Sequence, residues 1–221
     1  MKPDLPYRNR VEAGRFLAAA LGGYKSRPEV VVLGLTRGGV PVAAEVARAL
    51  HAPLDVVVVR KLGAPFEPEL AMGAIAGDGA EVLDEELIRT FGIARKDVDA
   101  IIAKERAEVE RRERLYRAGQ PPLDLKDRTA ILVDDGLATG STMLAAVAFA
   151  RKRSAKRIVL AAPVASHQAV EKLRGKVDEC IALATPEPFF AVGEWYSNFL
   201  PVSDTEVMKL LQANTVAGVP A

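Results

Sequence analysis

The chain has 221 residues, of which 49% are hydrophobic and 27% charged, and its formal net charge is +1 at pH 7. This length suits one α/β domain with a large core, and two full domains would be cramped. A nearly neutral chain has no overall attraction to nucleic acid or to an anionic membrane. The single cysteine, Cys180, excludes an intramolecular disulfide framework and is typical of a reducing cytoplasm. No window is long and apolar enough for a transmembrane helix, so we expect a cytoplasmic protein of one domain.

Short apolar runs alternate along the chain with longer segments of helical pattern. Apolar runs bounded by turn residues predict buried strands, and segments with capping residues predict helices. The expected helices span 10–21, 41–50, 84–91, 95–117, 143–153, 166–173 and 204–212. The expected strands span 30–35, 54–60, 130–133, 157–163 and 179–183, with further short strands in a loop over 61–83. Alternating strands and helices form parallel βαβ units. We therefore predict an α/β fold, a parallel twisted sheet flanked by helices, with ligands beyond the carboxyl ends of the strands.

The most informative segment is 130–142, with the sequence AILVDDGLATGST. A buried strand is followed by two acids, a loop with glycines and hydroxyls, and the start of a helix. Unpaired N–H groups and the helix dipole favour an anion at that helix start. Gly140 lets the backbone approach closely, and Thr139, Ser141 and Thr142 add hydroxyl donors without adding charge. A phosphate monoester fits this arrangement.

Asp134 and Asp135 cannot bind a phosphate directly, because like charges repel. They are better suited to the two hydroxyls of a ribose, or to a magnesium ion that the substrate carries. Successive strand residues point to opposite sides, so the two acids are expected to have different tasks. The pattern predicts a sugar phosphate site. The alternative is an ordinary strand, turn and helix in which serine and threonine only cap the helix.

Residues 133–143, VDDGLATGSTM, closely resemble the signature of the type I phosphoribosyltransferases, which bind PRPP (phosphoribosyl pyrophosphate). The resemblance implies the Rossmann-like fold of that family, Mg²⁺ as cofactor, and PRPP and a small heterocyclic acceptor, such as a nucleobase, as partners. It implies that Asp134 and Asp135 hold the ribose hydroxyls, either of them also contacting Mg²⁺ directly or through water. The loop that wraps the 5′-phosphate would comprise Gly136, Leu137, Ala138, Thr139, Gly140, Ser141 and Thr142. The sequence leaves a homodimer open.

Two further segments supply groups for the leaving pyrophosphate. The first contains Thr36, Arg37, Gly38 and Gly39, where the glycines free backbone N–H groups to face an anion. It resembles the pyrophosphate loop of the family, in which an unusual peptide bond often directs the backbone toward the ligand. The alternative is a plain turn between a strand and a helix.

The second segment is Arg60–Lys61, directly after an apolar run at 56–59. Cations at the carboxyl end of a buried strand would lie beside the proposed site. Family members carry basic residues there and a mobile lid after them, here from Leu62 to Gly73. A solvated end of a strand is the alternative. The implied reaction displaces pyrophosphate from the anomeric carbon by a nitrogen nucleophile, with Asp134, Asp135, Arg37 and Lys61 as the catalytic residues.

The sequence says least about which acceptor the protein uses. Hypoxanthine-guanine phosphoribosyltransferases carry an Asp three positions after the second acid, where this chain has Ala138. The motif looks more like that of adenine phosphoribosyltransferases, in which a residue of the lid provides acid–base help. Glu67 or Glu69 could have that role here, and an ordinary surface acid is the other interpretation of each.

The resemblance also implies a hood over the acceptor, formed by about 1–27 and 185–212 around a core of about 28–184, with a frayed tail at 213–221. Residues 185–199 contain five aromatic side chains. Aromatic side chains stack on flat bases, and the candidates are Phe189, Phe190, Trp195 and Tyr196. A satellite apolar cluster or a subunit contact is the alternative.

A rival hypothesis of another class is a regulatory protein that binds PRPP without transferring its ribose phosphate. A DNA-binding version needs a basic helix-turn-helix or a cationic surface, and neither is visible in the sequence. The charged segment 103–117 has acids and bases at helical spacing, which predicts a solvated helix face. Nucleic acid is therefore not an expected partner.

Overall fold

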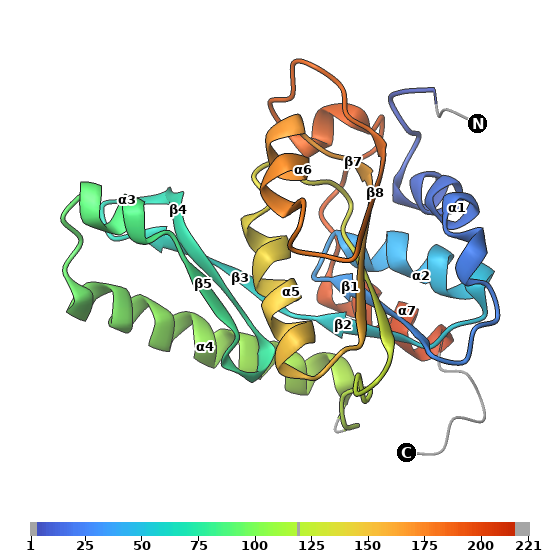
Figure 1. The fold of residues 1–221 in the computed structure, drawn as a ribbon, viewed down its shortest axis with the longest axis horizontal. Helices are drawn as coiled ribbons and strands as arrows, with labels where there is room; N and C mark the ends of the chain where they lie inside the picture. Colours follow the sequence, from blue (N-terminus) through green and yellow to red (C-terminus); the bar gives the residue numbers. More distant parts are fainter. Residues whose placement is uncertain (1–3, 119, 215–221) are drawn as a thin grey trace.

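The computed structural model describes residues 4–118 and 120–214. Within them, a five-stranded parallel sheet has the order β2-β1-β6-β7-β8 (Figure 1). Its strands are β1 (Val30–Leu35), β2 (Leu54–Val57), β6 (Thr129–Val133), β7 (Arg157–Val164) and β8 (Glu179–Ala184). Every residue of β1, β2 and β6 is buried, because helices cover both faces of the sheet. The predicted α/β fold is confirmed.

Helices pack on both faces of this sheet. They are α1 (Arg10–Ala20), followed by the short η1 (Gly22–Tyr24), α2 (Gly39–Leu50), α5 (Ser141–Lys152) and α6 (His167–Leu173). α1 and α2 cover one face of the sheet, and α5 and α6 cover the other (Figure 1). Val32 packs in the cluster with α1 and α2, whereas Leu33 packs in the cluster with α5 and α6. This alternation along a strand gives the domain two apolar layers, one on each side of the sheet.

After β2 the chain enters a three-stranded antiparallel sheet in the order β3-β4-β5, which we call the arm (59–83). Its parts are β3 (Val59–Ala64), β4 (Glu67–Ala76), η2 (Gly77–Gly79) and β5 (Glu81–Leu83). The arm lies between α5 and α4 (Arg95–Arg117), and α3 (Glu85–Thr90) lies near its far end (Figure 1). This sheet is separate from the central parallel one.

The arm differs from the expected strand over 54–60 and the expected lid loop. β2 ends at Val57 and β3 begins at Val59, so one apolar run contributes to two sheets. β4 is ten residues long and is covered on both faces. Ala74 packs on the α5 side of the arm, and Ile75 packs on the α4 side. Local sequence does not reveal that a segment is covered on both faces by distant helices.

The N-terminal segment of the described chain meets a segment that follows β8, near the carboxyl ends of β6 and β7. The Tyr7 N–H donates to the carbonyl of Trp195 at 2.9 Å, and the Ser197 N–H donates to the carbonyl of Tyr7 at 2.7 Å. The Tyr7 hydroxyl donates to the carbonyl of Pro163 in β7 at 3.3 Å. We call the two segments, residues 4–9 and 185–200 with η3 (Val192–Trp195), the hood.

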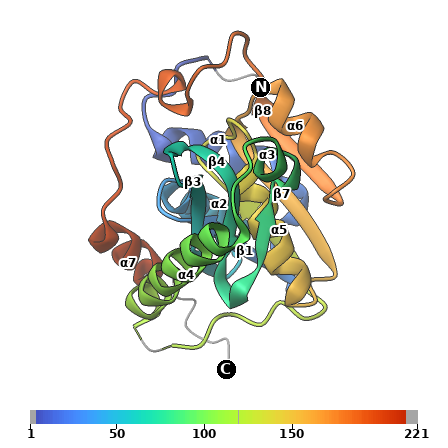
Figure 2. The ribbon, with the colours of Figure 1, turned by 90° about the vertical axis from the view of Figure 1, so that its left-hand side faces the viewer.

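Two helices within the expected hood boundaries lie elsewhere. The inward face of α1 packs on the central sheet, and α7 (Asp204–Ala213) packs against α2 and α4. Figure 2 shows the segment after η3 running down one side of the molecule to α7. Of the expected tail at 213–221, Ala213 is the last residue of α7 and 215–221 lie outside the described residues. None of the helices in the described ranges has the length and apolar character that crossing a membrane requires.

Candidate functional site

The loop after β6 connects that strand to the start of α5. The Leu137 N–H donates to the carbonyl of Val164 at 3.0 Å, which anchors the loop on the neighbouring strand β7. Gly140 is the N-cap of α5 and has φ +72°, a left-handed conformation that glycine adopts without strain. Within the described residues, no side chain accepts a hydrogen bond from the first N–H groups of α5. These donors are therefore available to an anion, because neither serine nor threonine caps this helix within the described residues.

The hydroxyl-bearing residues lie around this helix start. Thr139 is exposed, and its hydroxyl lies 3.4 Å from that of Ser141, the first residue of α5. Lys172 of α6 donates to the Ser141 hydroxyl at 3.2 Å, which brings a cation to the same place. Thr142 follows as the second residue of the helix. The loop thus combines backbone donors, hydroxyls and one ammonium group.

Three other loop residues have packing roles. Leu137 is 1% exposed, so only its backbone can contribute to ligand binding. The carbonyl of Ala138 accepts a hydrogen bond from the Ser166 hydroxyl at 2.5 Å. A Cβ at Gly136 would lie 2.4 Å from Cγ1 of Val192, so the hood packs directly on this loop.

The two acids have different surroundings. Oδ1 of Asp134 accepts a hydrogen bond from the Asp135 N–H at 2.9 Å. Oδ2 of Asp135 accepts a hydrogen bond from Nε of Arg10 at 2.7 Å. The backbone carbonyl of Asp135 accepts one from the Tyr196 hydroxyl at 2.5 Å. Burial raises the pKa of the Asp134 carboxyl well above its usual value, and the nearby Asp135 raises it further. Burial also raises the pKa of Asp135, but the guanidinium of Arg10 opposes that shift. Asp135 is thus the better placed of the two to remain ionised.

The glycine loop after β1 lies directly against these acids. A Cβ at Gly38 would lie 2.1 Å from Oδ2 of Asp135, and a Cβ at Gly39 would lie 2.5 Å from the carbonyl oxygen of Val133. The peptide bond between Thr36 and Arg37 is cis. The Thr36 hydroxyl oxygen is buried and has no hydrogen-bond partner among the described residues. The structure therefore brings together the two loops that the sequence predicted separately.

Arg37 extends from the glycine loop toward the C-terminal helix. Its Nη1 lies 3.5 Å from Oδ1 of Asp204 at the start of α7. The same oxygen accepts a hydrogen bond from the Tyr116 hydroxyl at 2.6 Å, which lowers the pKa of Asp204 and keeps it ionised. Both partners of the ion pair are substantially exposed, at 40% for Arg37 and 32% for Asp204. An exposed pair of this kind contributes little stability and can exchange for an anionic ligand.

Arg60 and Lys61 do not share one site. Both lie near the start of β3, not at the carboxyl end of a strand of the parallel sheet. Nε of Arg60 donates to Glu105 of α4 at 2.7 Å. Nζ of Lys61 donates to the carbonyl and carboxylate of Glu69, at 2.7 and 3.1 Å. Because adjacent strand residues point to opposite faces, Arg60 faces α4 and Lys61 faces the α5 side of the arm, the side that also meets the start of α5.

Residues 6–196 match the sequence model of the family described as "Phosphoribosyl transferase domain". The chain belongs to this family. It is 48% identical over 205 residues to a Mycobacterium tuberculosis protein with the name "Putative phosphoribosyl transferase Rv0571c". That match covers 93% of this chain and 46% of the relative, so the chain spans less than half of the relative's length.

Solved structures resemble the whole fold. TT1426 from Thermus thermophilus is 42% identical, with a TM-score of 0.80 over 95% of this chain and 99% of the other. AQ2163 from Aquifex aeolicus is 10% identical, with a TM-score of 0.52 over 94% of this chain and 86% of the other, and that likeness concerns the fold alone.

The aromatic residues that the sequence predicts to lie over the acceptor differ in how far their side chains are buried. Tyr196 is 5% exposed and stacks on Phe199, with ring centroids 5.1 Å apart. Phe189 and Trp195 pack together at 6.0 Å within the hood, and the indole N–H of Trp195 is buried with no acceptor in the described part of the chain. Phe190 is 77% exposed. The alternative of an apolar cluster thus describes Tyr196, Phe189 and Trp195, whereas Phe190 is the one of the four that is largely exposed.

The acids do not form a metal site of their own. No group of three or more His, Cys, Asp or Glu residues that could hold a metal ion occurs within the described ranges. Asp135 already accepts a hydrogen bond from Arg10, and Asp134 accepts one from the backbone. The expectation that Asp134 and Asp135 bind Mg²⁺ therefore gains no support from the donor set. An ion at this place would need most of its oxygen ligands from the phosphates of a substrate.

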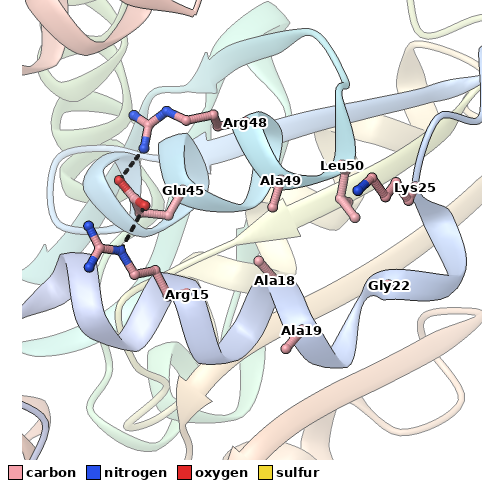
Figure 3. A pocket seen from close by; sticks show the side chains of 9 residues that line it. All are labelled: Arg15, Ala18, Ala19, Gly22, Lys25, Glu45, Arg48, Ala49 and Leu50. Atoms are coloured by element: carbon pink, nitrogen blue, oxygen red, sulfur yellow. Dashed lines mark hydrogen bonds and ion pairs between the residues drawn. The ribbon is translucent and has the colours of Figure 1, made fainter.

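Two cavities differ in their relation to this site. One of about 420 Å³ lies between α1 and α2, where Glu45 links Arg15 and Arg48 (Figure 3), and it contains none of the predicted site residues. A second of about 280 Å³ lies between the arm and the start of α5, and both Ser141 and Lys172 line it. Only the second adjoins the phosphate loop.

Three residues near the predicted site were not expected from the sequence. They are Arg10, Lys172 and Asp204, from α1, α6 and α7. Each is an ordinary charged residue in a helix, and its neighbours in the sequence carry no motif. Only the packing of those helices brings these side chains to the loops, so no local signal could have identified them.

We expect alanine at Gly38 to damage the site. Its φ of −61° and ψ of −34° permit any residue, so the effect comes only from the overlap with Asp135. Such overpacking costs about 1–3 kcal/mol of stability, and thermal unfolding of Gly38→Ala measures it. Gly23→Ala is the matched control, since no described atom lies within 4 Å of its Cβ position. Equal melting temperatures for the two variants would contradict the close contact.

We also expect Asp134→Asn to stabilise the protein increasingly as the pH rises. A carboxyl group whose pKa is raised by folding stabilises the native state relative to the unfolded state only while it is protonated. Its ionised form destabilises the native state, and this cost grows as the pH rises above the pKa of about 3.9 in the unfolded chain. Asparagine keeps the acceptor for the Asp135 N–H and cannot ionise. Each unit of raised pKa corresponds to about 1.4 kcal/mol at high pH. Melting temperatures at pH 4.5 and pH 8 test this, and a difference between variant and wild type that shrinks with pH would refute it.

Proposed function

We propose that this protein transfers the ribose phosphate of PRPP to a nitrogen acceptor, a nucleobase, and releases pyrophosphate. The observation that carries the proposal is the contact between the two loops. The acids Asp134 and Asp135 lie at the carboxyl edge of the sheet, shortly before the uncapped start of α5, and Asp135 lies directly against Gly38 of the glycine loop. A bound PRPP requires this combination, because its 5′-phosphate, its ribose diol and its diphosphate are joined in one small molecule.

Each part of PRPP has a candidate partner. The 5′-phosphate accepts hydrogen bonds from the first N–H groups of α5 and from the hydroxyls of Thr139, Ser141 and Thr142. The ribose hydroxyls donate to the aspartates after β6. The diphosphate contacts the backbone of the glycine loop and the side chain of Arg37, which leaves its exposed partner Asp204. Mg²⁺ enters as part of the PRPP complex.

The reaction needs positioning and charge neutralisation more than covalent chemistry. A nitrogen lone pair of the base forms a bond to the anomeric carbon, and the bond from that carbon to the pyrophosphate oxygen breaks with its electron pair on pyrophosphate. Cations near the leaving group stabilise the charge that develops there. Lys61 suits this task, because it lies on the α5 side of the arm and, in the part of the chain that the structure describes, its ammonium group binds only Glu69, whose side chain is 91% exposed.

The two adjacent cations of the arm provide a matched test. We expect Lys61→Met to weaken pyrophosphate binding about tenfold, because a charge-assisted hydrogen bond contributes about 1.5–3 kcal/mol. Arg60→Met should leave the affinity within about twofold, since Arg60 faces α4 and pairs with Glu105. Isothermal titration calorimetry with pyrophosphate measures both. A larger loss for the Arg60 variant would overturn the assignment.

A screen of nucleobases tests the reaction itself. With PRPP and Mg²⁺ present, we expect pyrophosphate release in the presence of one base and only slow release without any base, since the site must exclude water. Pyrophosphate is measured with a coupled enzyme assay. Tight PRPP binding with no release for any base would show the regulatory alternative instead, and absence of PRPP binding would refute both.

A further inference from the structure

The side chain of Arg10, the first residue of α1, contacts three groups at once. Its Nε donates to Oδ2 of Asp135 at 2.7 Å, and its Nη1 donates to the carbonyl of Leu200 at 2.8 Å. Its guanidinium carbon lies 3.9 Å from the centroid of the Phe199 ring. Charge, directed N–H donors and a flat face that stacks on an aromatic ring are properties that only a guanidinium combines.

The ion pair is buried, which distinguishes it from the others around the site. The side chains of Arg10 and Asp135 are 11% and 12% exposed, against 40% and 32% for Arg37 and Asp204. Exposed pairs are weak and exchange readily. Removing one partner of a buried pair leaves a charge without compensation, which costs far more. The contact of Arg10 with Asp135 is therefore a persistent part of the site.

The start of α1 fixes where Arg10 lies. The side chain of Asn9 accepts a hydrogen bond from the Glu12 N–H at 3.0 Å, which caps the helix one residue before Arg10. On the other side, the Tyr196 hydroxyl holds the carbonyl of Asp135. Two independent contacts thus hold Asp135, one from α1 at its side chain and one from the hood at its backbone.

We propose that Arg10 is a positioning residue of the pentose site. It orients the carboxylate of Asp135 before a ligand arrives and couples that carboxylate to hood residues 199–200. The inference rests on the proposed function, in which Asp135 binds the ribose hydroxyls. It adds that the hood and the pentose site move as one unit. A substitution at Arg10 therefore changes ribose recognition, although Arg10 does not contact the diphosphate.

Two ligands separate this role from a merely structural one. We expect Arg10→Met to weaken PRPP binding in the presence of Mg²⁺ about tenfold, and to leave pyrophosphate binding within about twofold. Calorimetry at a temperature well below the melting point measures both affinities. Arg10→Lys keeps the charge but not the planar fork, so it should restore only part of the PRPP affinity. Arg8→Met is the matched control, because Arg8 precedes α1, its side chain is 85% exposed, and its one ion pair within the described residues is with Glu12 of that helix.

Phe199→Leu provides a second variant should Arg10→Met not fold. It keeps an apolar side chain but removes the ring on which the guanidinium stacks, so PRPP affinity should fall while pyrophosphate affinity does not. Hydrogen exchange at the Ser197 and Asn198 amides, which donate to Tyr7 and Arg8 carbonyls, should also become faster in both variants.

Four outcomes decide the matter. A selective loss of PRPP affinity with faster exchange in the hood supports the inference. Unchanged PRPP affinity, or equal losses for PRPP and pyrophosphate, overturns it while leaving the proposed function in place. Wild-type protein that binds neither ligand would overturn the proposed function, and the inference with it.

Discussion

The close contact between the glycine loop after β1 and the acids after β6 is the constraint on which the site depends. β1 and β6 are neighbours in a parallel sheet, so the loops at their carboxyl ends reach the same edge. Gly38 and Gly39 approach so closely that any side chain there would overlap Asp135 or the end of β6. The shape of one loop therefore requires the shape of the other. Anion donors, acids and the backbone of the glycine loop are fixed together.

The charged groups of the site have protein partners, and those partners come from other parts of the chain. Arg37 pairs with Asp204 of α7, Lys61 with Glu69 of the arm, and Arg10 of α1 with Asp135. The first two pairs are exposed, so an anionic ligand can replace them at little cost in free energy. The third is buried and keeps its geometry. We propose on this basis that Arg37 and Lys61 rearrange around a ligand, whereas Arg10 positions Asp135 before the ligand binds.

Much of the fold could be predicted from the sequence because buried parallel strands leave a strong local signal. The runs 30–35 and 130–133 correspond closely to β1 and β6, and the helix expected over 95–117 has the bounds of α4. The arm was harder, because its strands are covered by α4 on one face and by α5 on the other, and both helices follow the arm in the chain. An apolar run such as 54–60 carries no mark of the point where it passes from one sheet to another. The roles of individual site residues and of the aromatic residues in the hood stay predictions.

By itself, the sequence determined the α/β architecture and the segment to which we assign the proposed anion site. Both follow from local patterns, namely apolar runs, turn glycines and a helix start preceded by two acids. Only the tertiary structure decided which charges meet there. Arg60 and Lys61 are adjacent in sequence but lie on opposite faces of β3, whereas Arg10 and Asp135, 125 positions apart, form a buried ion pair. The direction of a side chain depends on the pleat of its strand or on how its helix packs, and neither can be predicted from the separation of two residues along the chain.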